Sequence, residues 1–243
     1  MPYRAVLEFD AAGRPFLSES EVHHLVRVRR LGEGETFLGL ARNQAAWYRC
    51  RLSCQDGEWV VDIVTRIGTV GESSLEIVLG VALIKKARFE WMIQKACELG
   101  VSEIVPLTTG YVEESLAKQA GKLLPRWQTI VKESVKQCGR SRAPVMRPVS
   151  RLAEFLEFSS GALQIVLDPE ADKDLHEVKR GSGDIGSRRI AVLSGPEGGW
   201  GVRECRLFEE HDARPVFLGP RTLRSETAAV AAVVLVQYLW GDL

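Results

Sequence analysis

The sequence predicts an α/β protein of two domains, in which a small β-rich domain precedes a larger domain with a mostly parallel sheet. The chain has 243 residues, which suits one large domain or two ordinary ones. Residues 1–70 contain short strand patterns separated by turn residues, whereas residues 74–243 alternate buried strands with amphipathic helices. Residues 68–73 contain two glycines and little apolar content, and are interpreted as the linker.

Composition excludes several classes of protein. Hydrophobic residues make up 45% and charged residues 26%, as in ordinary globular proteins. The 32 Lys and Arg balance the 32 Asp and Glu, which argues against a polybasic or an acidic tail. The balance does not exclude a nucleic-acid partner, because binding needs only a basic face. No signal peptide is recognised, and the most apolar stretch, 228–240, is too short to span a bilayer. Five scattered cysteines without a CxxC pair predict reduced thiols and a cytoplasmic protein.

The N-terminal region predicts a small barrel of short strands joined by turns. Strands are expected over residues 3–9, 36–41, 46–53 and 58–67. Asp56-Gly57 between the last two is a strong hairpin signal. Ser18 and Glu21 form a capping box that begins a brief helix through Leu25.

The C-terminal region predicts a parallel sheet covered by helices on both faces, because strands and helices alternate. Strands are expected over residues 75–84, 101–107, 163–168, 190–194 and 215–218. The helices are expected to end at Gly100 and Gly139, to begin near Val202, and to extend over 225–239. The polar stretch 172–187 is expected to be a surface excursion.

Four glycines lie in the turn 195–201, between an expected strand and an expected helix. Such a turn lets backbone amides approach a ligand closely, but it also suits a plain tight connection, and the glycines alone do not decide. The turn does not complete GxGxxG, because Glu204 stands where the last glycine belongs, and no P-loop Lys-Ser/Thr follows. Ser194 is not a nucleophile elbow, because Val192 rather than glycine lies two residues before it.

A second glycine-bearing loop, 218–227, also leads from a strand into a helix. Ser225 is a good N-cap, and Glu226 is favourable at the positive end of the helix. Arg221 and Arg224 oppose the helix dipole there, which indicates another task, such as holding an anion or a polar base edge. Two loops at the carboxyl ends of strands in an open α/β sheet are the expected ligand site.

Positive charge is concentrated between residues 118 and 151, where nine Lys and Arg accompany a single acid, Glu133. The next segment, 154–184, has eight acids and three bases. A solvated helix face is the plain explanation, but the imbalance favours an RNA-binding surface. The residues expected to contact RNA are Arg27, Arg29, Arg30, Lys85, Arg88, Arg140 and Arg142, the last two as a phosphate clamp. The four histidines lack metal-ligand spacing, so we expect no metal site.

Several segments in order resemble the motifs of the RsmE-type 16S rRNA (uracil-N3)-methyltransferases of the SPOUT superfamily. They are residues 83–90 with 95–101, 133–134 with 137–142, 193–199, and 218–219 with 223–229. His23-His24-Leu25 and the arginines after it resemble the PUA-like barrel of that family. Trp200 and Gly201 depart from the resemblance, because family members more often have Phe or Leu and then Ser or Thr.

The resemblance implies a C-terminal domain with a deep trefoil knot, an obligate homodimer, and S-adenosyl-L-methionine (SAM) as cofactor. It implies methylation of uracil N3 in 16S rRNA of the small ribosomal subunit. The residues expected to surround SAM are Leu193, Gly195, Glu197, Gly198, Leu218, Gly219 and Leu223. Arg224 is the expected cation that stabilises the uracil anion, and Glu226 the candidate base, with helix capping as its alternative role.

Two other functions compete with this one. A non-catalytic RNA-binding module in ribosome assembly explains the basic stretch but not the two glycine turns. A nucleotide-dependent oxidoreductase is weakened by the incomplete GxGxxG pattern. Binding experiments distinguish the three functions: the methyltransferase binds SAM, the oxidoreductase binds NAD, and the RNA-binding module does not bind SAM.

Overall fold

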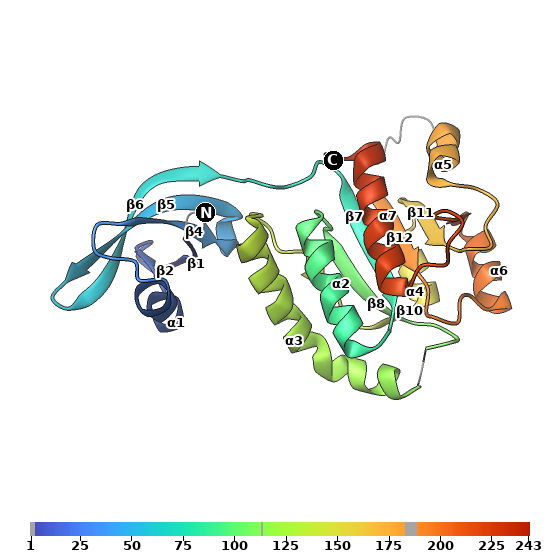
Figure 1. Ribbon diagram of the computed structural model, residues 1–243, viewed down its shortest axis with the longest axis horizontal. Helices are drawn as coiled ribbons and strands as arrows, with labels where there is room; N and C mark the ends of the chain where they lie inside the picture. Colours follow the sequence, from blue (N-terminus) through green and yellow to red (C-terminus); the bar gives the residue numbers. More distant parts are fainter. Residues whose placement is uncertain (1–2, 113, 183–188) are drawn as a thin grey trace. The chain divides into compact units, whose positions relative to one another are not determined.

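The computed structural model describes residues 3–112, 114–182 and 189–243, which fold into two compact units (Figure 1). The first unit comprises the chain up to Glu72 together with Lys132–Ala143, and the second comprises Ser73–Val131 and Pro144–Leu243. Within the described ranges, no helix combines the length and the apolar character that crossing a bilayer requires.

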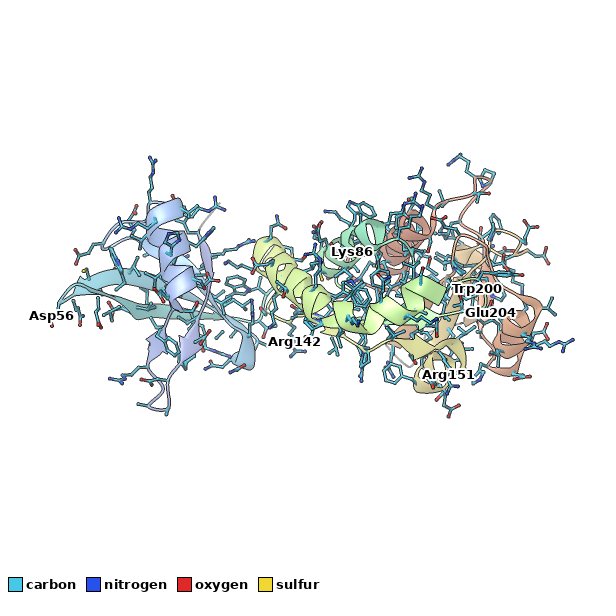
Figure 2. The ribbon with its side chains drawn as sticks, turned by 90° about the horizontal axis from the view of Figure 1, so that it is seen from below. Asp56, Lys86, Arg142, Arg151, Trp200 and Glu204 are labelled. Carbon is cyan, nitrogen blue, oxygen red and sulfur yellow. The ribbon has the colours of Figure 1, made fainter. Side chains whose placement is uncertain are left out.

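The first unit contains a four-stranded sheet and a small hairpin. The strands are β1 (Arg4–Val6), β2 (Glu8–Phe9), β3 (Pro15–Phe16), β4 (Thr36–Ala41), β5 (Ala46–Gln55) and β6 (Glu58–Gly68). The sheet order is β1-β4-β5-β6, and β2 pairs with β3. The expected hairpin is confirmed: Gln55 pairs with Glu58, and Asp56 and Gly57 at its tip have positive φ values of 51° and 85° (Figure 2). The expected strand over 3–9 is divided between β1 and β2.

Short helical segments complete the first unit. They are α1 (Glu19–His23), the π-helical turn η1 (His24–Val28) and the 3-10 turn η2 (Arg42–Gln44). The Ser18 hydroxyl accepts the Glu21 backbone N–H at 3.4 Å, which confirms the Ser18 half of the expected capping box. The Glu21 carboxylate pairs with Lys136 at 2.8 Å instead. The core of this unit contains Leu25, Phe37 and Cys50, and burial raises the pKa of the Cys50 thiol to about 12. This thiol therefore stays protonated and unreactive.

The second unit is built on a parallel sheet, as the alternating pattern predicts. Its strands are β7 (Glu76–Ala82), β8 (Glu103–Thr108), β9 (Val145–Met146), β10 (Ser150–Arg151), β11 (Leu163–Leu167), β12 (Arg189–Ser194) and β13 (Arg214–Val216). The order is β10-β8-β7-β12-β11-β13, with β9 also beside β8, and each described pair is parallel. Their carboxyl ends therefore share one edge of the sheet.

Helices cover both faces of this sheet (Figure 1). They are α2 (Lys86–Glu98), α3 (Glu114–Cys138), α4 (Leu152–Phe158), α5 (Leu175–Ser182), α6 (Val202–Glu210) and α7 (Ser225–Trp240). Alternation along β7 separates the two layers: Leu79 packs in one cluster with Phe89 of α2, and Val78 in another with Phe155 of α4. The last turns of α3, from Lys132, belong to the first unit.

The expectation of a surface excursion over 172–187 is wrong for its first part. Helix α5 occupies Leu175–Ser182, and Leu175 and Val178 are buried in the core. Their spacing of three residues is helical, but the charged residues around them conceal it. Residues 183–187 of that prediction lie outside the described residues.

Candidate active site at the carboxyl ends of three strands

A cavity of about 420 Å³ lies in the second unit where β11, β12 and β13 end. Its walls come from the segments that follow these three strands, from the first turns of α7, and from Arg88 at the start of α2. The place matches the expected ligand site of a parallel α/β sheet, and the size suits a small organic ligand.

The glycine turn after β12 is shaped by Trp200. The indole N–H donates to the Leu167 carbonyl at 2.9 Å, and the ring packs edge-on against Phe208, with centroids 5.0 Å apart. A Cβ atom on Gly195 would lie 2.9 Å from the indole Cε2 atom. Glycine is therefore required at 195 by close packing, and at Gly199 by a φ of 74°.

The loop after β13 reaches the same cavity and is tied to the glycine turn. Ser225, the expected N-cap, is instead the first helical residue of α7; the N-cap is Arg224, without a side-chain cap. The Ser225 hydroxyl donates to the Gly195 carbonyl at 2.6 Å, and the Ser194 hydroxyl donates to the Ser225 carbonyl at 3.0 Å. A hydroxyl suited to capping thus joins the two loops.

Most residues expected to surround a cofactor line this cavity, and two do not. Those in its wall are Gly195, Glu197, Leu218, Gly219 and Leu223. Leu193 is fully buried in the core between the sheet and helices α4 and α6. Gly198 faces Tyr111 instead, since an added Cβ would lie 3.1 Å from the Tyr111 Cβ.

The end of β11 also belongs to the site, which the sequence analysis missed. Leu167, Asp168 and Pro169 line the cavity. Asp168 directly after a buried parallel strand was the available signal, but only the strand order places β11 beside β12. Trp200 lines the cavity too, although the sequence marked it only as a departure from a family pattern.

Charged groups of opposite sign lie at this cavity. Arg224 lines it and is exposed, and within the described residues its side chain has no hydrogen bond or ion pair. Glu226 is not in the cavity wall and is only 7% exposed; its Oε1 atom lies 3.7 Å from Nε of Arg88, which lines the cavity. Its Oε2 atom is buried with no hydrogen-bond partner in the described part of the chain. Arg88 also forms an ion pair with Glu197.

The arrangement suits chemistry that creates negative charge and releases a proton. A guanidinium without a carboxylate partner stabilises an anion, and a buried carboxylate with a free oxygen accepts a proton. No group of three or more His, Cys, Asp or Glu side chains in the described ranges is placed to hold a metal ion.

The family model for the RNA methyltransferase domain matches residues 71–237. The chain belongs to this family of RNA methyltransferases. It is 30% identical over 232 residues to ribosomal RNA small subunit methyltransferase E of Synechocystis, covering 92% of this chain and 72% of the relative. It is 28% identical over 228 residues to the Bacillus subtilis protein of the same description, covering 91% and 89%.

Solved structures agree with the family. Ribosomal RNA small subunit methyltransferase E from Neisseria gonorrhoeae, bound to SAM, aligns over 100% of this chain and 99% of its own with a TM-score of 0.85 and 30% identity. A putative methyltransferase from Legionella pneumophila in complex with SAM aligns over 100% of both chains with a TM-score of 0.84 and 28% identity.

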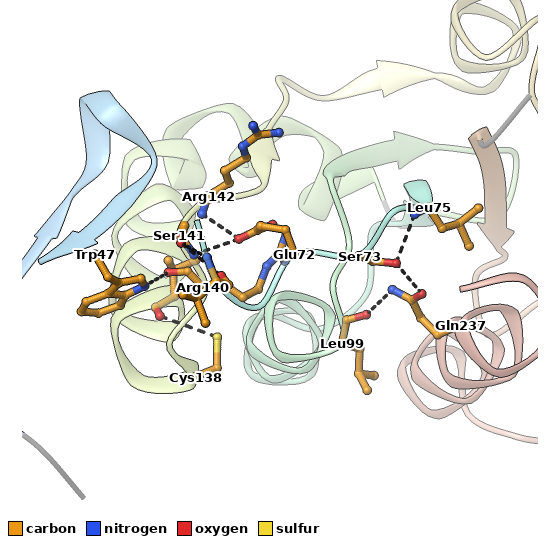
Figure 3. Close-up of polar contacts among 12 residues, drawn as sticks. Trp47, Glu72, Ser73, Leu75, Leu99, Cys138, Arg140, Ser141, Arg142 and Gln237 are labelled. Atoms are coloured by element: carbon orange, nitrogen blue, oxygen red, sulfur yellow. Dashed lines mark hydrogen bonds and ion pairs between the residues drawn. The ribbon is translucent and has the colours of Figure 1, made fainter. Parts of the chain in front are cut away.

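One arginine of the expected phosphate clamp in this RNA methyltransferase is not on the surface. Arg140 is 5% exposed, and its guanidinium pairs with Glu72 at 2.9 Å (Figure 3). The same carboxylate accepts the backbone N–H groups of Ser141 and Arg142, each at 2.8 Å. The Arg140 guanidinium, expected to reach a phosphate, is instead paired in this structure with a carboxylate 68 residues away. Only the Arg142 side chain of the pair is exposed.

The basic stretch of this methyltransferase is largely neutralised by acids from elsewhere in the sequence. At least five of its nine cations have carboxylate partners among the described residues: Arg126 with Glu90, Lys136 with Glu21, Arg140 with Glu72, Arg147 with Glu103, and Arg151 with Glu154. The charge imbalance therefore overstates the basic surface.

Four of the other five cations expected to contact RNA are exposed. Arg27, Arg29 and Arg30 are exposed at and just after η1, and Arg30 has the unusual φ of 60°. Lys85 is exposed at the N-cap of α2. Arg88 is partly buried at the cavity, where it serves two carboxylates.

Proposed function

We propose that this protein transfers a methyl group from SAM to N3 of a uridine in 16S rRNA of the small ribosomal subunit, in the cytoplasm. The observation that carries the proposal is the cavity that the two loops matching the family motifs form together, with Arg224 in its wall and Glu226 beside Arg88 of that wall. The SAM-bound relatives of the same fold support the cofactor.

The residues of the cavity fit SAM. Its sulfonium and amino groups are cationic, and the carboxylates of Asp168 and Glu197 line the wall. Its apolar atoms suit Leu218 and Leu223, and the glycine turns leave backbone groups open to its polar ones. Bound SAM supplies an electrophilic methyl carbon on sulfur.

This chain's own residues prepare the nucleophile. Uracil N3 carries a weakly acidic proton, so it must lose that proton before its lone pair can form the N–CH₃ bond as the C–S bond breaks. Glu226 accepts the proton through its unpartnered oxygen. Arg224 stabilises the negative charge that spreads over O2 and O4. Alignment of N3 with the methyl group supplies much of the remaining rate.

We assign residues 1–70 to a PUA-like RNA-binding barrel and residues 74–243 to the methyltransferase domain, with the two cavity loops in a deep trefoil knot. The motif resemblance and the similarity to the relatives over the full length support both assignments, and tracing the chain in a crystal structure tests them. Arg27, Arg29, Arg30, Lys85 and Arg142 are the proposed phosphate contacts, because they are exposed. Glu72, which pairs with Arg140, holds the segment that carries Arg142.

The proposed reaction is tested by mapping methylated nucleotides in 16S rRNA from cells that lack this protein. We expect one N3-methyluridine to disappear and the purified protein with SAM to restore it; retention of the modification would contradict the reaction.

In methylation assays with the purified protein, replacing Arg27, Arg29 and Arg30 together by alanine should raise the KM for RNA without changing kcat. A non-catalytic module would bind no SAM in a calorimetric titration, and an oxidoreductase would bind NAD.

A homodimer is supported by exposed apolar side chains on two neighbouring helices of the second unit. Val234 and Tyr238 of α7 are exposed, Tyr238 at 67%, and Trp91 is exposed on the neighbouring helix α2. We expect light scattering to give about twice the 27.0 kDa chain mass, and Tyr238→Glu to give the monomer mass. Val202→Glu, at an exposed apolar residue of α6, is the matched control and should leave the dimer intact. A Tyr238→Glu protein that stays dimeric would contradict this interface.

A further inference from the structure

Glu204, a buried carboxylate of the second unit, has no part in the chemistry proposed above. It is the third residue of α6 (Figure 2). It is 8% exposed and lies outside the cavity wall. Its Oε2 atom accepts the backbone N–H of Gly201 at 2.7 Å, and its Oε1 atom accepts the backbone N–H of Gly110 at 2.9 Å. One carboxylate therefore joins the last residue of the glycine turn to the loop that follows β8.

The loop after β8 supports the glycine turn directly. Tyr111 follows Gly110, and its Cβ lies 3.1 Å from the position of a Cβ on Gly198. Its ring lies 3.7 Å from the corresponding position on Gly201. The turn thus rests against Tyr111 near its middle and its end, and the Glu204 contact to Gly110 fixes where Tyr111 stands.

Helix capping alone does not explain Glu204, as helix α4 of the same unit shows. Glu154 is also the third residue of its helix, and its carboxylate accepts the N-cap N–H of Arg151 at 3.0 Å. Its side chain is 49% exposed, and its hydrogen-bond partners, Ser150 and Arg151, are both local. Both glutamates cap a helix, but Glu204 also makes a bond to a segment 94 residues away.

We propose that Glu204 is a positioning residue of the SAM cavity, which it shapes by fixing the glycine turn against the loop after β8. The inference rests on the proposed function, because it assigns the cofactor to this cavity. A carboxylate that accepts two N–H groups away from water makes stronger hydrogen bonds than a neutral acceptor. Its loss leaves the Gly110 N–H without its partner and the turn free to leave its binding conformation.

The test compares Glu204→Ala, Glu204→Gln and Glu154→Ala with the unaltered protein in calorimetric titrations with SAM. Glu204→Ala should raise the Kd for SAM about 10-fold, the effect of losing one charge-assisted hydrogen bond. Glu204→Gln should also weaken binding, because an amide offers one acceptor oxygen to two donors. Glu154→Ala should keep the Kd within about 2-fold, since it removes only a local cap.

Two further readouts separate positioning from general stability. Hydrogen exchange of the Gly110 and Gly201 amides should speed up in Glu204→Gln and stay unchanged in Glu154→Ala, without any ligand present. In methylation assays, the KM for SAM should rise in Glu204→Gln while kcat at saturating SAM stays near the original value, because the reacting groups remain in place.

The outcomes distinguish this inference from the function on which it rests. If the unaltered protein binds no SAM, the proposed function fails and the inference fails with it. If the unaltered protein binds SAM and both Glu204 variants bind it equally well, only the inference is overturned. If Glu204→Ala does not fold, the isosteric Glu204→Gln decides: unchanged Kd and unchanged exchange of the Gly110 amide would overturn the inference.

Discussion

Replacing Arg224 by alanine should lower the rate of methyl transfer about 100- to 1,000-fold, the usual cost of removing a group that stabilises charge in a transition state. The reason is that Arg224 is the cation proposed to stabilise the negative charge of the uracil anion. Affinity for SAM should not fall, because the cofactor is itself a cation near the reacting sulfur. Single-turnover assays at saturating SAM and RNA measure the chemical step directly.

The Arg224→Ala substitution should affect the reaction without disturbing the fold. Arg224 is exposed and has no side-chain partner among the described residues, so its removal leaves no buried group unpaired. Arg203→Ala, at an exposed arginine of α6, controls for loss of one positive charge from the same unit. Arg224→Lys should recover part of the rate, because it restores charge without the planar fork. An Arg224→Ala enzyme with unchanged rate would remove Arg224 from the mechanism.

Local signals account for the elements that the sequence predicted well. Strand β12 was expected over 190–194 and occupies Arg189–Ser194, because an apolar run stops at a glycine turn. Helix α7 was expected over 225–239 and occupies Ser225–Trp240, because the apolar stretch 228–240 follows the second glycine-bearing loop. The order β7-β12-β11 has no local signal, since it depends on pairing between strands far apart in sequence. Helix α5 was missed because, among its described side chains, only Leu175 and Val178 reach the core.

The difference between local signals and contacts far apart in sequence also explains which features of the site could be predicted. Both glycine loops could be predicted, because conformational freedom is a property of the residue itself. The partner of a charged residue is not such a property: the run of cations that includes Arg140 says nothing about Glu72. Trp200 was visible only as an unusual residue. Its function in the structure depends on the Leu167 carbonyl, which β11 brings to the cavity.

The contact between Gly195 and Trp200 leads to a second large effect. Gly195→Ala would place a methyl group 2.9 Å from the indole Cε2 and 3.3 Å from its Nε1. The ring is held by its bond to Leu167 and by Phe208, so it cannot yield without losing these contacts. Overpacking of this kind costs about 1–3 kcal/mol. Because the strain falls on the cavity wall, we expect affinity for SAM to fall about 30-fold, measured by calorimetry.

A matched control and a second substitution show whether this contact is the cause. Gly121→Ala makes the same chemical change within α3, where an added Cβ would meet nothing within 4 Å, so SAM affinity should stay unchanged and the helix should gain about 0.5–1 kcal/mol. Trp200→Phe removes the ring atoms that crowd residue 195. In the double variant, Gly195→Ala should therefore cost much less than it does alone, a coupling that a double-mutant cycle measures. If the two effects simply add, the indole does not set the shape of the glycine turn, and the requirement for glycine at 195 has another cause.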